Sequence, residues 1–499
     1  MSGATPDELI ATFEAERARA LGHEGRRGAA LYYTPPSVAA QVVELAQRHG
    51  ARGVVLDPCA GAGAFLLAAA RAGFSHLRGI DQDAAALRVA RKALSGFRVQ
   101  LERADALETR PHGRIDCIVS NPPYGHVRPD AALLRRYPAL RGGEVDRYAL
   151  FMLRALELVR PGGVAALLVP DTWMFLSRAS RFREEVLRLS ELAAAVDLGK
   201  PFAAAKDTRV MAVVLVRKPA AVRETYVGRG SESLSPAPRA ELVAQARRGW
   251  CLYRTPLERA LCEAMEAASL PLGRACDVGY GLRTGDNRRH VARRAPLQGE
   301  VALAGGEDIT PFALAWKPKA LLDGERLSTL VARQLGRPRV AVQRIRTNAQ
   351  APWARWLEAA PVPGEMVCLD SLSTLAADDE RLWALLALLQ SVALQRFHRL
   401  RTTDVNVKPS ALRELPVPRR LLDDPRELAE LSRARPRCPD GAIDRAIDGR
   451  VYALFGLSKE LVEACERGFW ADRYDEENQR LRESCQTPPL RLRVNGRTA

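Results

Sequence analysis

The segment Asn121-Pro122-Pro123-Tyr124 combines residue types that could activate an aromatic amine. Such an amine is a poor nucleophile because its lone pair is delocalised into the ring. Asn121 Oδ1 and the Pro122 carbonyl could accept both of its N–H groups and so localise the lone pair. The Tyr124 ring would stack on the amine's ring, and the prolines would fix the geometry before a substrate arrives. In isolation the segment could equally be a simple turn. Its position in the fold must therefore distinguish a catalytic loop from a turn.

Seven apolar runs predict the buried strands of an α/β fold. Helical patterns separate most of these runs, which favours a Rossmann-like, mostly parallel, seven-stranded sheet. The prolines after Asn121 would end the fourth strand, at the sheet edge where open α/β sheets bind ligands. The runs are 53–57, 76–80, 97–101, 115–119, 164–169, 194–198 and 210–216.

A turn of small residues, 58–63, follows the first predicted strand. Its glycines would let a ligand approach the backbone closely. The turn lacks the full Gly-x-Gly-x-x-Gly pattern of dinucleotide sites, and it has no Gly-Lys-Ser/Thr for phosphates. A nucleoside with a charged, phosphate-free arm fits better, and S-adenosylmethionine is such a ligand. Asp81 and Asp105 follow later strands and could contact the nucleoside, or they could simply cap helices.

The composition favours a polyanionic partner, since the formal net charge is +16. Of the 75 basic residues only eight are lysine; arginine suits bidentate contacts to phosphate and guanine, although a G+C-rich genome would give the same bias. The nine cysteines form no Cys-x-x-Cys pair, which argues against a zinc site or a disulfide framework, so we expect no metal. No apolar run approaches the ~20 residues of a membrane span. We therefore expect a soluble, cytoplasmic protein with no membrane partner.

Taken together, these motifs resemble the γ-class N6-adenine DNA methyltransferases of type II restriction-modification systems. The resemblance is specific over residues 29–218 and implies a class I methyltransferase domain that uses S-adenosylmethionine. It implies catalytic roles for Asn121, Pro122, Pro123, Tyr124 and Phe202. Phe202 would be a second aromatic on the flipped adenine, although a core position fits it as well. The implied cofactor-binding residues are Tyr33, Thr34, Pro35, Asp57, Cys59, Gly61, Gly63, Phe65, Asp81, Gln82, Asp105, Ala106 and Asn121.

Residues 270–460 resemble the family's target-recognition domains more loosely. The resemblance implies that double-stranded DNA binds here, with the target adenine flipped out of the helix. Each candidate DNA contact could also be a solvated surface residue. The candidates are Arg283, Arg288, Arg289, Arg344, Arg346 and Lys408.

We predict four segments. Residues 1–220 form the methyltransferase domain, with 1–30 as an N-terminal helix or arm, and 221–249 form a linker. Residues 250–420 form an α+β target-recognition domain, and 421–499 form a helical segment with a basic tail. We expect a monomer on DNA. No lysine has an acid two residues before it, so the common Asp/Glu-x-Lys nuclease core is missing. A separate partner, a restriction endonuclease or a defence-system subunit, would have to cut.

Two other functions fit part of the sequence. Enzymes that methylate RNA guanine or the glutamine of release factors also carry Asn-Pro-Pro-Tyr, but they are generally small, and the long C-terminal region argues against them. A non-catalytic DNA-binding subunit is the other alternative. The intact Asn121, Tyr124 and Asp57 argue against it.

Overall fold

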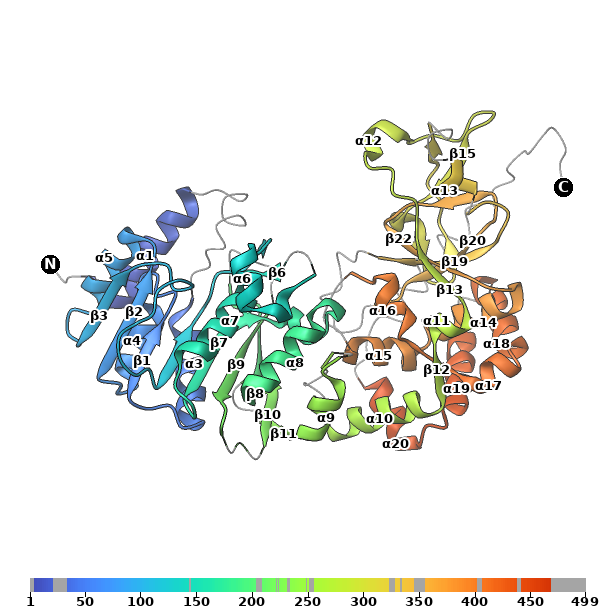
Figure 1. Cartoon of the computed structure of the whole chain (residues 1–499). Helices are drawn as coiled ribbons and strands as arrows, with labels where there is room; N and C mark the ends of the chain where they lie inside the picture. The colour runs from blue at the N-terminus through green and yellow to red at the C-terminus, as the bar shows by residue number, and fades with distance from the viewer. Residues whose placement is uncertain are drawn as a thin grey trace. The chain divides into compact units, whose positions relative to one another are not determined.

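The computed structural model divides the chain into two compact units, Met1–Tyr253 and Arg254–Ala499 (Figure 1). Tyr33, Arg346 and the predicted basic tail lie outside the described residues. The structure describes residues 4–20, 34–142, 145–202, 209–220, 222, 224–230, 234–247, 249–250, 255–322, 328–332, 334–344, 355–401, 406–437 and 441–467. No helix within these ranges is long and apolar enough to cross a membrane.

The first unit is built on a nine-stranded sheet. Strand β9 runs antiparallel to both β7 and β8, and β11 runs antiparallel to β10, whereas the other neighbours are parallel. Strands β1 to β4 and β7 to β9 are the seven predicted ones, which confirms the mostly parallel α/β sheet. The spatial order is β11 (Leu234–Ala237), β10 (Thr225–Arg229), β8 (Ser190–Gly199), β9 (Val210–Arg217), β7 (Val164–Pro170), β4 (Cys117–Ser120), β1 (Val54–Asp57), β2 (His76–Asp81) and β3 (Val99–Arg103).

The predicted linker 221–249 instead extends this sheet by two strands. β10 pairs in parallel with β8, and its Val227 is buried while the flanking residues are polar or glycine. β10 lies between β8 and the edge strand β11, and neither added strand has much apolar pattern, which is why this stretch of sequence resembles a linker. Trp250 is buried beside Trp173, with the two rings edge to face and their centroids 5.2 Å apart. The unit therefore continues beyond the expected boundary at residue 220.

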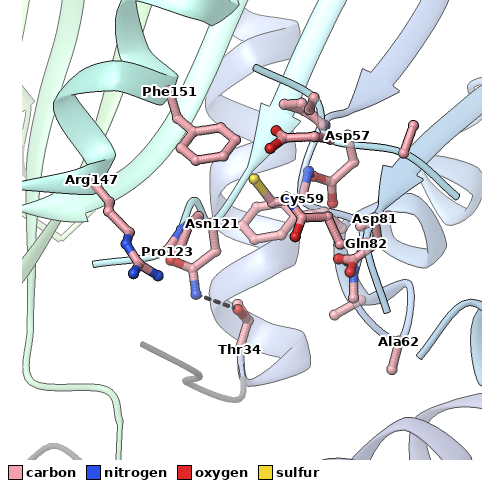
Figure 2. A pocket seen from close by; sticks show the side chains of 18 of the residues that line it. Thr34, Asp57, Cys59, Ala62, Asp81, Gln82, Asn121, Pro123, Arg147 and Phe151 are labelled. Atoms are coloured by element: carbon pink, nitrogen blue, oxygen red, sulfur yellow. Dashed lines mark hydrogen bonds between the residues drawn. The ribbon is translucent and has the colours of Figure 1, made fainter. Parts of the chain in front are cut away.

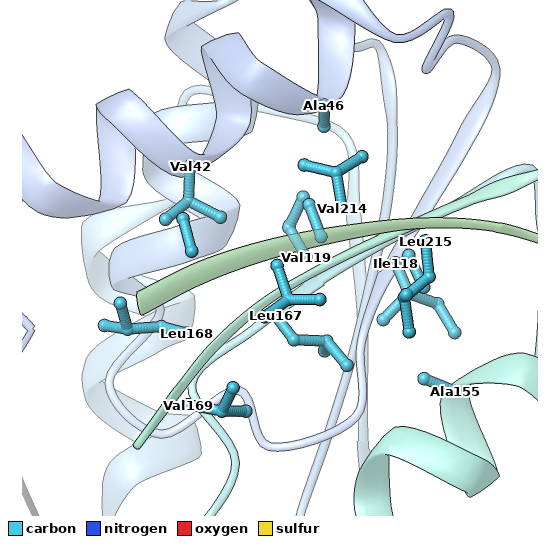
Figure 3. Packing of buried hydrophobic residues seen from close by; sticks show 14 of the residues in the cluster. Val42, Ala46, Ile118, Val119, Ala155, Leu167, Leu168, Val169, Val214 and Leu215 are labelled. Atoms are coloured by element: carbon cyan, nitrogen blue, oxygen red, sulfur yellow. The ribbon is translucent and has the colours of Figure 1, made fainter. Parts of the chain in front are cut away.

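Helices cover both faces of the central strands. Figure 3 shows Val42 and Ala46 of α3 on one side of the sheet and Ala155 of α7 on the other. β4 and β7 are buried along their whole length, so they read as continuous apolar runs. The helices and short elements of this unit are α1 (Pro6–Ala20), α3 (Pro36–Arg48), α4 (Ala64–Arg71), α5 (Ala84–Ala93), α6 (Ala131–Arg136), α7 (Arg147–Leu158), α8 (Ser180–Leu189), α9 (Arg239–Gln245), the strands β5 (His126–Val127) and β6 (Val145–Asp146), and the 3₁₀ turns η1 (Pro138–Leu140), η2 (Asp171–Met174) and η3 (Ser177–Ala179).

The second unit combines small sheets with a group of helices, which confirms the predicted α+β class. One sheet has the order β13 (Asp277–Tyr280), β22 (Leu372–Ala376), β19 (Arg339–Gln343), β20 (Ala359–Val362). Another has the order β14 (Val291–Ala292), β18 (Ala320–Leu321), β15 (Val301–Ala304), β21 (Met366–Cys368). Two-stranded pairs are β12 (Ser269–Pro271) with β23 (Pro416–Pro418), and β16 (Ile309–Thr310) with β17 (Ala313–Leu314).

The C-terminal helices belong to the core of this unit and do not form a segment apart. Leu428 of α18 and Ile447 and Val451 of α19 are buried in one cluster with residues of α14 and α15. Asp448 Oδ1 accepts a hydrogen bond from the Val392 N–H at 2.8 Å, which ties α19 to the start of α15. The helices and 3₁₀ turns are α10 (Pro256–Ala267), α11 (Leu272–Ala275), α12 (Asn287–His290), α13 (Ser328–Ala332), α14 (Asp379–Gln390), α15 (Val392–Arg401), α16 (Pro409–Arg413), α17 (Arg419–Asp423), α18 (Arg426–Ala434), α19 (Ala442–Phe455), α20 (Lys459–Glu466), η4 (Gly306–Asp308) and η5 (Arg435–Arg437).

Candidate active site

The Asn121–Tyr124 segment lies where predicted, directly after β4 at the carboxyl edge of the parallel strands. Two hydrogen bonds orient the Asn121 side chain. Its Nδ2 donates to Thr34 Oγ1 at 3.0 Å, the bond drawn in Figure 2, and the Tyr124 hydroxyl donates to its Oδ1 at 2.6 Å. A carbonyl oxygen has two lone pairs. Asn121 Oδ1 can therefore accept a second hydrogen bond while it keeps that of Tyr124.

Tyr124 holds Asn121 but does not present an open ring face. The residue is only 5% exposed, and the Leu168 carbonyl, 3.2 Å from the hydroxyl oxygen, is a second and more distant acceptor for its single proton. Phe202 is buried next to Tyr124, with the ring centroids 6.4 Å apart, and the Tyr148 ring packs edge to face against Tyr124. The structure thus brings the two predicted aromatics together. Stacking on a substrate stays a prediction that requires the Tyr124 ring to become exposed.

The small-residue turn after β1 is fastened to the end of β2. The Gly61 N–H donates to Asp81 Oδ2 at 2.7 Å, and Gly61 and Gly63 have φ values of 51° and 97°. These values lie in the left-handed region that favours glycine. A Cβ on Gly63 would lie 3.2 Å from the Ala90 Cβ, so a side chain there would also crowd α5. The turn therefore holds its backbone close to the cavity that it lines.

Three carboxylates, those of Asp57, Asp81 and Asp105, lie at or just after the ends of the neighbouring strands β1, β2 and β3. Asp83, and not Asp81, caps α5 by accepting hydrogen bonds from two of its N–H groups, so the cap interpretation of Asp81 is wrong. Asp81 instead joins the glycine turn to the backbone of Asp83. Asp105 accepts a hydrogen bond from the Leu107 N–H at 2.9 Å, and it lines the cavity as well.

Asp57 is the most deeply buried of these acids. It is 1% exposed and accepts hydrogen bonds from Ser120 Oγ at 2.6 Å and the Cys59 N–H at 3.0 Å. Burial raises the pKa of Asp57 to about 7, although both hydrogen bonds act in the opposite direction. A group in the cavity wall therefore changes charge near neutral pH.

A cavity of about 470 Å³ connects these side chains. This volume is within the range of small-molecule sites, roughly 300–1,000 Å³. Of the predicted residues, Pro35, Gly63, Pro122, Tyr124 and Phe202 are outside its lining. The predicted residues in the lining are Thr34, Asp57, Cys59, Gly61, Phe65, Asp81, Gln82, Asp105, Ala106, Asn121 and Pro123. Carboxylates for hydroxyl and cationic groups, an apolar wall and glycine backbone suit a nucleoside with a charged arm.

The sequence interpretation missed lining residues on two helices. Ile10 and Glu14 reach the cavity from α1, and burial raises the pKa of Glu14. No local pattern connects α1 to a turn some fifty residues away, so sequence alone offered no signal. Arg147 and Phe151 reach the cavity from α7. Their spacing of four residues in a predicted helix puts them on one face, a signal that could have found both.

The candidate DNA contacts lie in the second unit. Arg283, Arg288 and Arg289 are exposed, the last two on the short helix α12. The Arg344 guanidinium lies over the Tyr280 ring, 5.0 Å from its centroid, and also donates to the Asp370 carbonyl. Lys408 is half-buried at the start of α16. DNA binding by these residues stays a prediction.

The first unit matches known methyltransferase families. Residues 97–202 match the Eco57I restriction-modification methylase family, and residues 39–134 match the methyltransferase small domain. The type II methyltransferase M.VspI of Vibrio sp. (strain 343) is 28% identical over 181 residues, 34% of this chain and 44% of the relative. M.TthHB8I of Thermus thermophilus is also 28% identical, over 296 residues, 56% of this chain and 65% of the relative.

Two further comparisons bear on function and fold. The release factor glutamine methyltransferase of Streptomyces coelicolor is 35% identical over 141 residues, 24% of this chain and 49% of that protein. Each of these three alignments spans less than two thirds of the relative's length. The cryo-electron microscopy structure of a DrdV–DNA complex shares the fold over 86% of this chain and 59% of that chain, with a TM-score of 0.54 and 12% identity.

The fold and the two family matches define the first unit as a methyltransferase domain of the Rossmann-like type. The expected resemblance to restriction-modification methyltransferases is confirmed by the matches to the methylase family and to two type II enzymes.

Proposed function

We propose that this chain transfers a methyl group from S-adenosylmethionine to N6 of an adenine flipped out of double-stranded DNA, within a restriction-modification system. One observation carries the proposal. The amide of Asn121, oriented by Thr34 and Tyr124, lines the same cavity as Asp57, Asp81 and Asp105. A hydrogen-bond acceptor for an amine therefore lies beside a nucleoside-sized site.

S-adenosylmethionine, when bound, supplies an electrophilic methyl group, and the cavity residues suit its other parts. Asp81 at the end of β2 would accept hydrogen bonds from ribose hydroxyls, and Asp105 at the turn after β3 would contact the adenine ring. Phe65 and Phe151 supply apolar wall. Both matched families consist of methyltransferases, which supports this cofactor.

The chain's own contribution to the reaction is orientation and charge stabilisation. The second lone pair of Asn121 Oδ1 and the Pro122 carbonyl would accept the two N–H groups of the target amine. As the nitrogen–carbon bond would form, the sulfur–methyl bond of the donor would break and leave a neutral thioether. The nitrogen would become positive, and these two oxygens would stabilise the charge before a proton leaves to water. No general base with a tuned pKa is needed.

DNA would be bound through the second unit. Arg283, Arg288 and Arg289 present exposed guanidinium groups, and the whole chain carries a formal charge of +16. A base within a duplex is out of reach of the Asn121 loop, so the adenine must leave the stack. We propose a monomer on DNA, with any cutting done by a separate endonuclease.

The direct test is to express the chain in cells that lack adenine methylation and to sequence their DNA by a single-molecule method that detects modified bases. We expect N6-methyladenine at one sequence motif and none in cells with an empty vector. Unmodified DNA from cells that contain folded protein able to bind S-adenosylmethionine would contradict the proposal.

A second candidate function is methylation of a protein amide. The similarity to the release factor glutamine methyltransferase favours it, because a glutamine amide also offers two N–H groups to Asn121. That match leaves the second unit, with its exposed arginines, without a role. Radiolabelled methyl transfer to release factor, and none to mixed-sequence DNA, would favour the amide over adenine.

A further inference from the structure

Arg147 places a cation in a cavity whose other charged groups are acids. It is the first residue of α7 and lies one turn before Phe151, on the same wall. Figure 2 shows its guanidinium at the end of the cavity where the Asn121 amide and Thr34 lie. The Arg147 N–H donates to the Gly125 carbonyl at 2.9 Å, and Asp146 accepts from the Gly125 N–H at 2.8 Å. Its backbone is therefore fixed to the loop that follows Tyr124.

The Arg147 side chain has no protein partner within the described part of the chain, where it forms neither a hydrogen bond nor an ion pair. The acids that share the cavity are engaged elsewhere. Asp57 accepts from Ser120 and Cys59, and Asp81 accepts from Gly61 and Asp83. A guanidinium offers five N–H donors in a planar fork that fits a carboxylate in a bidentate manner. Arg147 is thus a ready receptor for an anionic group.

We propose that Arg147 binds the carboxylate of the methyl donor and so positions its amino-acid arm. The inference rests on the proposed function and deepens it. S-adenosylmethionine carries one anionic group, whereas its sulfur and amino group are positive. The carboxylates of Asp57, Asp81, Asp105 and Glu14 suit the cationic and hydroxyl groups, but they would repel its carboxylate. Among the described lining residues, Arg147 alone has the opposite charge.

This assignment also gives Arg147 a role in selectivity. Its position at the Asn121 end would hold the amino-acid arm beside the residue that orients the target amine. The Thr34 hydroxyl lies at the same end and could share the carboxylate. A donor without a carboxylate would leave the guanidinium unpaired and should bind less well. Arg147 would act as a positioning residue and take no part in bond formation.

The test compares two ligands by isothermal titration calorimetry on the full chain: S-adenosylmethionine and its decarboxylated analogue. Wild-type protein should prefer the carboxylated ligand by about 10- to 100-fold, the effect of a charged hydrogen bond. Arg147→Gln should bind both ligands within about threefold of one another, and Arg147→Lys should keep part of the preference. Arg88→Gln changes an exposed arginine of α5 outside the cavity lining and should keep all of it.

The same experiment can overturn the inference. It fails if Arg147→Gln, folded as judged by its thermal unfolding, keeps the wild-type preference. The affinity of the variant for DNA should be measured as well, without cofactor, by fluorescence anisotropy. If that affinity falls while the ligand preference stays as in wild type, the guanidinium binds a phosphate of DNA and the inference fails. Wild-type protein that binds no S-adenosylmethionine would contradict the proposed function itself. Wild-type protein that binds both ligands equally would contradict this inference alone.

Discussion

The two units of the chain organise their polar residues differently. In the first, side chains separated by nearly ninety residues, Thr34 and Asn121, meet in one hydrogen bond at the edge of a parallel sheet. In the second, the candidate DNA contacts differ in exposure: Arg283 and Arg288 are exposed, whereas Arg344 is partly held by Tyr280 and the Asp370 carbonyl. The first unit converges on a cavity, and the second presents a surface.

This difference follows from topology. Parallel strands put all their carboxyl ends at one edge, so polar residues after successive strands must come together. Short strands in several small sheets give no such rule, and each side chain's direction depends on local turns. A residue's role in the first unit should therefore be sharply defined, whereas roles in the second unit should be shared among several residues.

The sharpest test of this contrast is Asn121→Ala. The variant should lose at least ~10²–10³-fold in the rate of methyl transfer, because it removes a preorganised acceptor at the reacting amine. Affinity for DNA should stay near wild type, since the second unit is untouched. Single-turnover methylation and DNA-binding assays would measure the two effects. Near-normal turnover would remove Asn121 from the catalytic role.

Reversing charge on α12 tests the surface. Arg288→Glu with Arg289→Glu should weaken DNA binding by roughly tenfold or more and reduce the slope of log K against log salt by about 2, if both contact phosphates. Affinity for S-adenosylmethionine should not change. Arg419→Glu with Arg420→Glu alters two exposed residues of α17 and is the matched control. Equal losses in both double variants would indicate only a general effect of net charge.

Asp57 in the first unit and Asp448 in the second are buried aspartates whose pKa is raised to about 7, and the two should behave differently. Asp57 lines the cavity, so a bound cationic ligand should favour its ionised form and release a proton. Affinity for S-adenosylmethionine should then rise between about pH 6 and pH 8. Calorimetry in buffers of different ionisation enthalpy would detect the proton. Asp57→Asn should remove this dependence on pH, and a pH-independent wild type would contradict the assignment.

Asp448 should affect the free energy of unfolding and not the affinity for the cofactor. It is 5% exposed, and burial raises its pKa to about 7, against the hydrogen bond from Val392. Because the folded pKa exceeds the unfolded one, its contribution to folding is greatest at acid pH and is lost as the pH rises through about 7. The midpoint of unfolding of Asp448→Asn should therefore vary less with pH than that of wild type. Cofactor affinity should keep its wild-type dependence on pH.

The sequence predicted the parts of the molecule that follow from periodicity and topology. The seven central strands, the glycine turn and the position of Asn121 all came from apolar runs and the residues after them. Strand β10 was missed because its polar sequence resembles a linker, and Glu14 was missed because a contact between α1 and a distant turn has no local signature. The burial of Tyr124 could not be predicted from the sequence either, because the direction of a side chain depends on the residues packed around it.

That burial leads to the smallest expected effect. Tyr124→Phe keeps the ring but removes the hydroxyl that donates to Asn121 Oδ1. The amide would still be held by Thr34, so only one of its two restraints is lost. A neutral hydrogen bond contributes about 0.5–1.5 kcal/mol, which predicts a fall in the methyl-transfer rate of roughly 2- to 10-fold.

If Tyr124 acts mainly by stacking, Tyr124→Phe should retain the wild-type rate and Tyr124→Leu should lose far more. If it acts mainly by orienting Asn121, both variants should lose a similar amount. Single-turnover rates of the two variants thus decide whether Tyr124 serves the substrate directly or through Asn121.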